Sequence, residues 1–126
     1  MRAPRSRQTA GMSTPDPLLV AGLCAAWCGT CRDWQPVFDQ QAQAFTGRAD
    51  FAWVDVEDHD EVMGHVDVEN FPTLLIARGD EVLFFGTITP HVHTLARLVQ
   101  SALQGDLKPV RDSEVAGLPQ RVRAAL

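Results

Sequence analysis

The chain has 126 residues, a length typical of one domain, and its 45% apolar and 21% charged residues are ordinary for a globular protein. Eleven Lys and Arg residues against sixteen Asp and Glu residues give a net charge of −5, which argues against a general nucleic-acid binder. No apolar run approaches the roughly 18 residues of a membrane span. The three cysteines are an odd number, which excludes a small scaffold held together by paired disulfides.

The first 17 residues predict a flexible tail. Residues 1–15 carry three arginines and two prolines but no acid, and they show no hydrophobic periodicity. Together with the apolar run that follows, they superficially resemble a signal peptide. Cleavage after Ala26 would, however, remove a strand that the motif after it requires. We therefore expect a cytoplasmic protein. A start at Met12, with residues 1–11 as an upstream extension, stays open as an alternative.

The next segment predicts alternating strands and helices. The apolar run 18–26 has the length of a strand and is expected to be buried on both faces. Residues 30–45 carry apolar side chains three or four positions apart, which predicts an amphipathic helix, and Pro36 should kink it. A second strand is expected over 51–56 and a short helix over 58–64.

The second half predicts a hairpin followed by a helix. Residues 73–77 and 81–85 indicate two strands, and 78–80 indicate the turn between them. The Thr-Pro pair at 89–90 is typical of an N-cap and the first residue of a helix, which should run to residue 103.

The predicted order β-α-β-(α)-β-β-α indicates an α/β fold. We expect a mixed sheet of about four strands, in which the first two are parallel and the last two form an antiparallel hairpin, with helices on both faces. The chain then divides into the tail (1–17), the α/β domain (18–105) and a C-terminal extension (106–126). The extension is expected to contain a short helix near its end.

A W-C-G-T-C motif, made of Trp27, Cys28, Gly29, Thr30 and Cys31, lies where the first strand turns into the first helix. Cys28 would occupy the helix N-terminus, where free N–H groups and the helix dipole stabilise the nucleophilic thiolate. Cys31, one turn later, could attack a mixed disulfide formed at Cys28 and release the substrate as a dithiol. The spacing therefore indicates a nucleophile and a resolving partner.

The alternative for this motif is half of a zinc site, because C-x-x-C is also a metal-binding knuckle. Zinc would need two more ligands from the remaining cysteine and the four histidines, which are Cys24, His59, His65, His91 and His93. The sequence holds no second C-x-x-C and no paired Cys/His knuckle. Redox chemistry is therefore preferred, and no metal is expected.

With these motifs in place, the sequence resembles the thioredoxin family over roughly residues 18–104. The motif residues are the A-W-C-G-T-C stretch, a proline five residues after its last cysteine, a Phe-Pro-Thr sequence before a strand, and a glycine after the last strand. In this sequence they are Ala26 to Cys31, Pro36, Phe71, Pro72, Thr73 and Gly86.

The resemblance implies a thioredoxin-like fold and a substrate-binding role for the second group of motif residues. The residue matching Pro72 is a cis proline that faces the cysteines in the family, and the backbone beside it pairs with an extended substrate segment. Phe71, Thr73 and Gly86 belong to the same predicted surface. The resemblance also implies a monomer without a bound cofactor, which acts on protein disulfides and receives electrons from a separate reductase or thiol donor.

The sequence departs from the family pattern around its buried ion pair. The family's buried acid, six residues before the nucleophilic cysteine, falls on Gly22, and the lysine near it falls on Trp53. That acid is thought to help deprotonate the resolving cysteine, so water or Glu57 would have to replace it. Thr30 stands where the commonest motif has proline, which leaves the direction of net electron flow open.

Two further departures concern Cys24 and the N-terminal region. Cys24 replaces a residue that is usually aromatic in thioredoxins. Its place in an apolar strand favours a small, buried and unreactive core residue, and the alternative is an extra thiol that exchanges with Cys28 or is itself modified. Only seventeen residues precede the first predicted strand, so the family's opening βα unit is expected to be reduced or absent.

Other features have both a functional and an ordinary interpretation. Trp27 is favoured as part of an apolar platform for a substrate polypeptide, whereas platform and packing are equally supported for Phe71. Residues 50–69 hold eight acids and no Lys or Arg; a solvated face is favoured over a surface that steers basic partners. His91 and His93 are expected to be exposed and not to bind metal.

The leading hypothesis is a thiol–disulfide oxidoreductase that reduces protein disulfides in the cytoplasm through Cys28 and Cys31. Two alternatives stay open. One is an exported disulfide oxidase or isomerase, which Thr30 and the missing acid make conceivable. The other is a thioredoxin-like interaction module with little redox activity, suggested by the short N-terminal region and the C-terminal extension.

Overall fold

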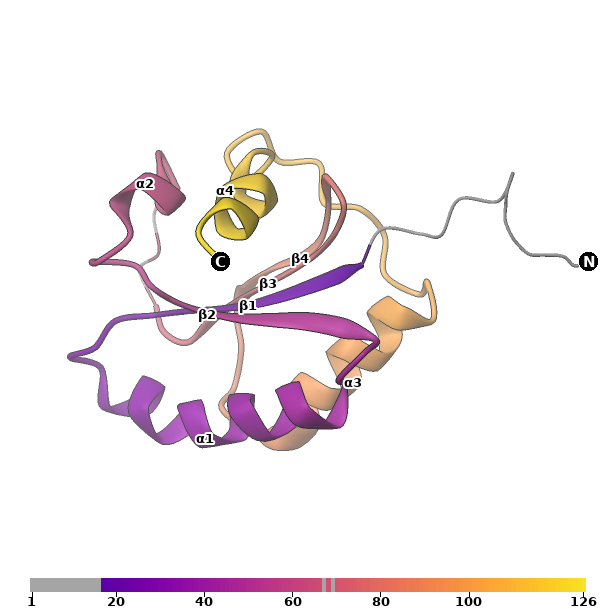
Figure 1. The fold of residues 1–126 in the computed structure, drawn as a ribbon, viewed down its shortest axis with the longest axis horizontal. Coiled ribbons are helices and arrows are strands. Elements are labelled where there is room, and N and C mark those ends of the chain that lie inside the picture. The colour runs from indigo at the N-terminus through magenta and orange to yellow at the C-terminus, as the bar shows by residue number, and fades with distance from the viewer. Residues whose placement is uncertain (1–16, 67, 69) are drawn as a thin grey trace, which may run out of the picture.

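The computed structural model describes residues 17–66, 68 and 70–126, so most of the predicted tail lies outside the described residues. The described chain forms one four-stranded sheet with helices on both faces (Figure 1). The elements are β1 (Leu18–Cys24), α1 (Gly29–Ala44), β2 (Ala49–Asp55), α2 (Asp60–Met63), β3 (Thr73–Arg78), β4 (Glu81–Thr87), α3 (Val92–Leu103) and α4 (Leu118–Ala124).

The sheet has the strand order β2-β1-β3-β4 and is mixed, as predicted. β1 pairs in parallel with β2 and antiparallel with β3, and β3 pairs antiparallel with β4. Every residue of β1 is buried. A central strand that is covered on both faces explains why 18–26 forms a continuous apolar run instead of an alternating one.

Successive β1 residues point to opposite faces of the sheet and into two separate cores. Leu18, Val20 and Cys24 join the core under α1 and α3. Leu19 and Leu23 join the core on the other face, with side chains from α2 and α4. In Figure 1, α1 and α3 lie below the sheet and α2 and α4 above it.

The C-terminal extension supplies part of the second core. Its short helix, expected near residues 119–126, is α4, and the side chains of Leu118 and Val122 are fully buried. Val115, in the loop before α4, is 2% exposed. Among the described residues, α4 and the four-residue α2 are therefore the helices that cover this face.

Two local predictions are wrong. The last long helix begins at Val92 with His91 at its N-cap, so Thr89 and Pro90 precede it instead of capping it. The Thr89 hydroxyl instead forms a hydrogen bond with the Thr94 hydroxyl, at 2.9 Å. Gly86 lies inside β4, opposite Leu74, and not after the strand.

None of the described helices combines the length and the apolar character that crossing a bilayer would need.

Candidate active site around three cysteines

Cys28 is the N-cap of α1, the position that the motif predicts. Its backbone is extended, and its N–H donates to the carbonyl oxygen of Ala25 at 3.0 Å. Its own carbonyl accepts the N–H of Arg32 at 3.2 Å, which is the first hydrogen bond of the helix. The residue is half-buried and holds a free thiol. A free thiol at a helix N-terminus, partly open to solvent, has the placement of a nucleophile.

Cys31 lies one turn further, on the face of α1 that packs against the sheet. The buried residues of this helix are Cys31, Trp34 and Phe38, spaced three and four apart. The side chain of Cys31 is 2% exposed. The two residues between the cysteines, Gly29 and Thr30, are both exposed on the first turn.

Cys31 is joined by a disulfide to Cys24, and Cys28 is not part of that bond. The Cα atoms of the two bonded residues are 5.9 Å apart, a separation common for disulfides. The prediction that Cys24 is buried is confirmed, since it is 1% exposed. The prediction that it is unreactive is wrong. As the last residue of β1 it points into the core under α1, directly opposite the first turn of that helix.

An aromatic contact joins the cysteine loop to the loop that precedes β3. The rings of Trp27 and Phe71 meet edge to face, with centroids 5.6 Å apart. Trp27 is 63% exposed, whereas Phe71 is half-buried and packs against the first core. An exposed indole supported in this way offers an apolar surface next to Cys28.

The loop before β3 is held close to the end of β1. The peptide bond between Phe71 and Pro72 is cis, and the Pro72 carbonyl accepts the N–H of Ile88 at 3.1 Å. The buried hydroxyl of Thr73 donates to the Asn70 carbonyl at 2.6 Å. Thr73 pairs with Leu23, the residue before Cys24, so this loop and the cysteine loop leave the same end of the sheet.

Gly22 is surrounded by aromatic rings. A Cβ atom added to it would lie 3.1 Å from a ring atom of Trp34, 3.1 Å from one of Phe38 and 3.2 Å from one of Trp53. Trp53 is also its partner on β2. An apolar aromatic cluster therefore fills the place of the family's ion pair. Gly22 stands at the position of the acid, and Trp53 stands at the position of the lysine.

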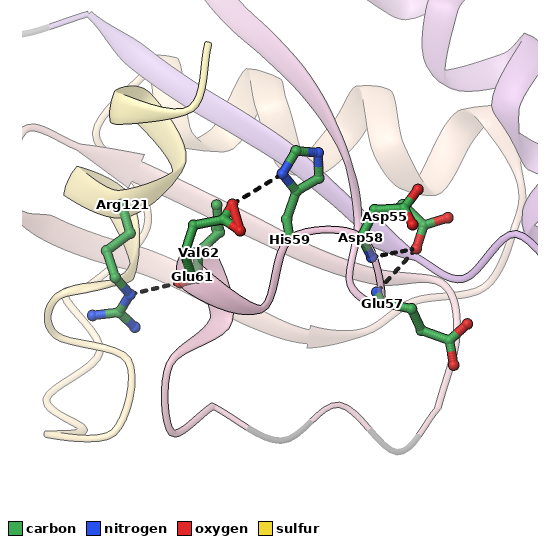
Figure 2. Close-up of polar contacts among 7 residues, drawn as sticks. All are labelled: Asp55, Glu57, Asp58, His59, Glu61, Val62 and Arg121. Atoms are coloured by element: carbon green, nitrogen blue, oxygen red, sulfur yellow. Dashed lines mark hydrogen bonds and ion pairs between the residues drawn. The ribbon is translucent and has the colours of Figure 1, made fainter.

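Asp55 is a carboxylate of this region that the sequence analysis did not single out. It is the last residue of β2 and pairs with Cys24 in the parallel register, so both side chains point to the same face of the sheet. One of its oxygens accepts the backbone N–H groups of Glu57 at 2.9 Å and Asp58 at 3.3 Å (Figure 2). Glu57, the candidate replacement base, is exposed, and its carboxylate points away from Asp55 (Figure 2).

The acidic segment continues into α2, where its described side chains face solvent. Glu57, Asp58, Asp60 and Glu61 are all exposed. The pKa of Glu61 is lowered, first because its carboxylate accepts a hydrogen bond from its own backbone and second because it bonds the His59 side chain. The His59 Nδ1 atom lies 3.1 Å from this carboxylate (Figure 2). Among the described residues, no group of His, Cys, Asp and Glu side chains is arranged to hold a metal ion.

Two comparisons of the sequence with known proteins agree on one family. The thioredoxin family model matches residues 9–101. Thioredoxin H2-1 of Oryza sativa subsp. japonica is 44% identical over 64 residues, which cover 51% of this chain and 46% of the relative. The thioredoxin of Chlorobaculum thiosulfatiphilum is 31% identical over 68 residues, which cover 54% of this chain and 63% of the relative.

A likeness in three dimensions supports the same fold. The crystal structure of the germline-specific thioredoxin Deadhead of Drosophila melanogaster superposes with a TM-score of 0.62 at 23% identity, covering 68% of this chain and 81% of that one. The matched part of this chain spans less than two thirds of the length of the two curated relatives named above. The family model, in contrast, matches most of this chain. The chain therefore belongs to the thioredoxin family.

Proposed function

We propose that this protein is a thiol–disulfide oxidoreductase that reduces disulfides of protein substrates through Cys28 and Cys31. The observation that carries the proposal is the position of two cysteines on α1. Cys28 is a half-buried free thiol at the N-cap, and Cys31, one turn later, is buried and already in a disulfide with Cys24. Membership of the thioredoxin family supports it.

The reaction needs two thiol–disulfide exchanges. The Cys28 thiolate attacks one sulfur of a substrate disulfide, forms a mixed disulfide and releases the first substrate thiol. The Cys31 thiolate then attacks the Cys28 sulfur of that mixed disulfide and releases the second substrate thiol. The substrate gains two electrons and two protons, and the protein is left with one disulfide.

Trp27, Phe71 and the loop of Pro72 form the proposed substrate surface. The exposed indole of Trp27 and the ring of Phe71 supply apolar area beside Cys28. Backbone groups next to Pro72 would pair with an extended substrate segment, as the family resemblance implies. Gly86 lies one strand away, on β4, and belongs to this proposal only through that resemblance.

The proposal includes a cytoplasmic setting and a separate electron donor. A cytoplasmic thiol pool keeps dithiols reduced, which suits a protein that donates electrons to disulfides. A reductase or a small thiol would then restore the reduced protein after each turnover, and the protein would act as a monomer.

Reduction of insulin disulfides with dithiothreitol as donor tests this function. We expect Cys28→Ser to lower the rate to that of dithiothreitol alone, because no nucleophile is left at the helix N-cap. Cys31→Ser should instead accumulate a mixed disulfide with an insulin chain, which mass spectrometry without reduction detects. Gln35→Ala changes an exposed residue of α1 outside the motif, without touching a thiol, and should stay close to the unmodified protein.

A Cys31→Ser variant that reduced insulin as fast as the unmodified protein would show that the two-cysteine mechanism is wrong. Equal rates for Cys28→Ser and the unmodified protein would reject the enzyme function altogether and favour an interaction module.

A further inference from the structure

The three cysteines lie in a row from the surface into the core. Cys28 is half-buried, while Cys31 and Cys24 are 2% and 1% exposed. Cys31 occupies the middle position for two reasons. It follows Cys28 by three residues, which places it on the same helix face. It also faces the end of β1, where the Cα atom of Cys24 is 5.9 Å away. Cys31 therefore has a cysteine partner on each side.

We propose that Cys24 is a third redox cysteine, which replaces Cys28 as the disulfide partner of Cys31 after the substrate has been reduced. The oxidised protein then carries a Cys24–Cys31 disulfide in its core and a free Cys28 thiol, the state described above. This inference rests on the proposed function, because reduction of a substrate supplies the disulfide that is moved.

The transfer is one more thiol–disulfide exchange and needs no further oxidant. Turnover leaves a Cys28–Cys31 disulfide and a Cys24 thiol. The Cys24 sulfur attacks the Cys31 sulfur, the Cys24–Cys31 bond forms, and the Cys28–Cys31 bond breaks. Cys28 leaves with the bonding electron pair and takes a proton from solvent, which it can reach because it is half-buried. The number of disulfides and the oxidation level of the protein stay the same.

Asp55 receives the proton that Cys24 loses. Cys24 is 1% exposed, so its proton needs an acceptor within the protein. The strand register places Asp55 beside Cys24 on the same face of the sheet. Only one Asp55 oxygen accepts backbone hydrogen bonds from the described residues that follow it, which leaves the other oxygen for the proton (Figure 2). Asp55 is half-buried and can pass the proton on to solvent.

The transfer has a consequence for reactivity. A Cys28–Cys31 disulfide presents a half-buried sulfur to an external thiol, whereas both sulfurs of a Cys24–Cys31 disulfide belong to residues of the core. The oxidised protein would thus store its disulfide away from solvent and keep a nucleophile at Cys28.

Disulfide mapping of the unmodified protein tests the inference directly. The fully reduced protein is mixed with excess insulin without oxygen, and samples are quenched at intervals with N-ethylmaleimide in a denaturant at mildly acidic pH, so that every free thiol is labelled. Chymotrypsin cleaves after Trp27 and so separates Cys24 from the other two cysteines, while trypsin cleaves after Arg32. We expect an early Cys28–Cys31 disulfide that is replaced by Cys24 linked to the fragment 28–32, with the maleimide on Cys28.

Each outcome of the mapping has one meaning. Maleimide on Cys24 at all times, with an internal Cys28–Cys31 disulfide, would overturn the inference and leave the proposed function intact. Maleimide on all three cysteines beside unreduced insulin would reject the proposed function and, with it, the inference.

Labelling of the native oxidised protein gives a second test. Cys24→Ala removes the third thiol, and Ala25→Gly removes a similar volume from the neighbouring buried residue as the matched control. The unmodified protein and Ala25→Gly should each take up about one maleimide per chain without denaturation, and Cys24→Ala should take up none, while all three still reduce insulin. Labelling of the unmodified protein only after denaturation would contradict the proposal, because the free thiol would then be the buried Cys24.

The role of Asp55 has its own pair of variants. Asp55→Asn should slow the change from the Cys28–Cys31 to the Cys24–Cys31 disulfide several-fold and leave the final pairing unchanged. Glu57→Gln, which alters an exposed carboxylate two residues away, should not affect the rate. An equal rate for Asp55→Asn and the unmodified protein would contradict the role of Asp55.

Discussion

Gly22 leaves room for three aromatic rings beside the central strand. Ring atoms of Trp34, Phe38 and Trp53 lie 3.1–3.2 Å from the point that a Cβ atom would occupy. These rings also contact one another, with Trp34 and Trp53 centroids 5.7 Å apart. The side chain of Trp34 is fully buried. An acid in this position would lack space, and the ring atoms nearest to it would all be carbon atoms.

We therefore predict that Gly22→Asp, which restores the acid of the family pattern, unfolds more easily and gains no activity. An uncompensated buried charge costs about 3–5 kcal/mol, and overpacking adds to that cost. Gly22→Ala, the matched control, adds only the tight Cβ contacts and should cost about 1–3 kcal/mol. The free energy of unfolding from urea titrations of both variants measures the difference.

A Gly22→Asp protein as stable as the unmodified one, with faster insulin reduction, would contradict this account. It would show that the site lacks only its acid and that the aromatic cluster tolerates one.

The positions of Cys28 and Cys31 could be predicted from the sequence, whereas the disulfide between Cys31 and Cys24 could not. Cys28 at a helix N-terminus and Cys31 one turn later follow from a strand, a motif and a helix in sequence. Cys24 shares the alternation of Leu18 and Val20 on β1, and Cys31 shares the helical spacing of Trp34 and Phe38. Those two patterns point both residues into one core. Their contact depends on how α1 sits on the sheet, which is long-range packing and not local propensity.

At the scale of elements, α4 forms side-chain hydrogen bonds to α2 through Arg121, in addition to the apolar contacts between the two helices. The Arg121 guanidinium donates to the carbonyl of Val62 at 2.5 Å (Figure 2) and to that of Met63 at 3.2 Å. These are the last two residues of α2, whose four-residue length leaves its terminal carbonyls without helical partners. Gly64 adopts a positive φ directly after them, and the guanidinium packs against it.

We predict that Arg121→Ala destabilises the protein by about 1.5–3 kcal/mol, the contribution of hydrogen bonds from a charged donor to partly buried acceptors. Arg123→Ala is the matched control on the same helix: it removes a partly exposed ion pair with Asp50 and an exposed hydrogen bond to the Pro17 carbonyl, and should cost about 1 kcal/mol, less than Arg121→Ala. Urea unfolding measures both. Equal losses for the two variants would show that Arg121 does not secure α2.

The remaining elements differ in how well local signals predict them. The strands and α1 follow from apolar runs and helical spacing, and they were placed to within a few residues. The start of α3 was predicted too early. Thr89 and Pro90 have the residue types of an N-cap and a first helical residue, but the N-cap in the structure is His91. The order β2-β1-β3-β4 places β3 beside β1 instead of β2, and this depends on how whole elements pack.

At the scale of the whole molecule, the described residues form one sheet between two helical layers, and the C-terminal segment completes one of them. Leu118 and Val122 of α4 lie in the same core as Leu19 and Leu23 of β1. A short helix could be predicted here from the sequence, but its position against the sheet could not. A helix of seven residues is too short to be stable by itself, so its position depends on packing against the apolar face of β1.

The proposed function places the chemistry at one end of that sheet. β1 ends at Cys24, β3 begins at Thr73, and the loops that carry Trp27 and Phe71 meet between them. The central claim is that the cysteines at this end exchange electrons reversibly with disulfides in solution.

A redox titration of the protein against a defined dithiol/disulfide buffer, read by maleimide labelling and intact mass, tests that claim most directly. We predict one reversible two-electron transition near −270 mV, about the value of thioredoxin and suited to a reductant. A midpoint between about −120 and −200 mV would identify an oxidant or isomerase and contradict the reductive direction. The absence of any reversible two-electron transition would contradict the thiol–disulfide chemistry itself.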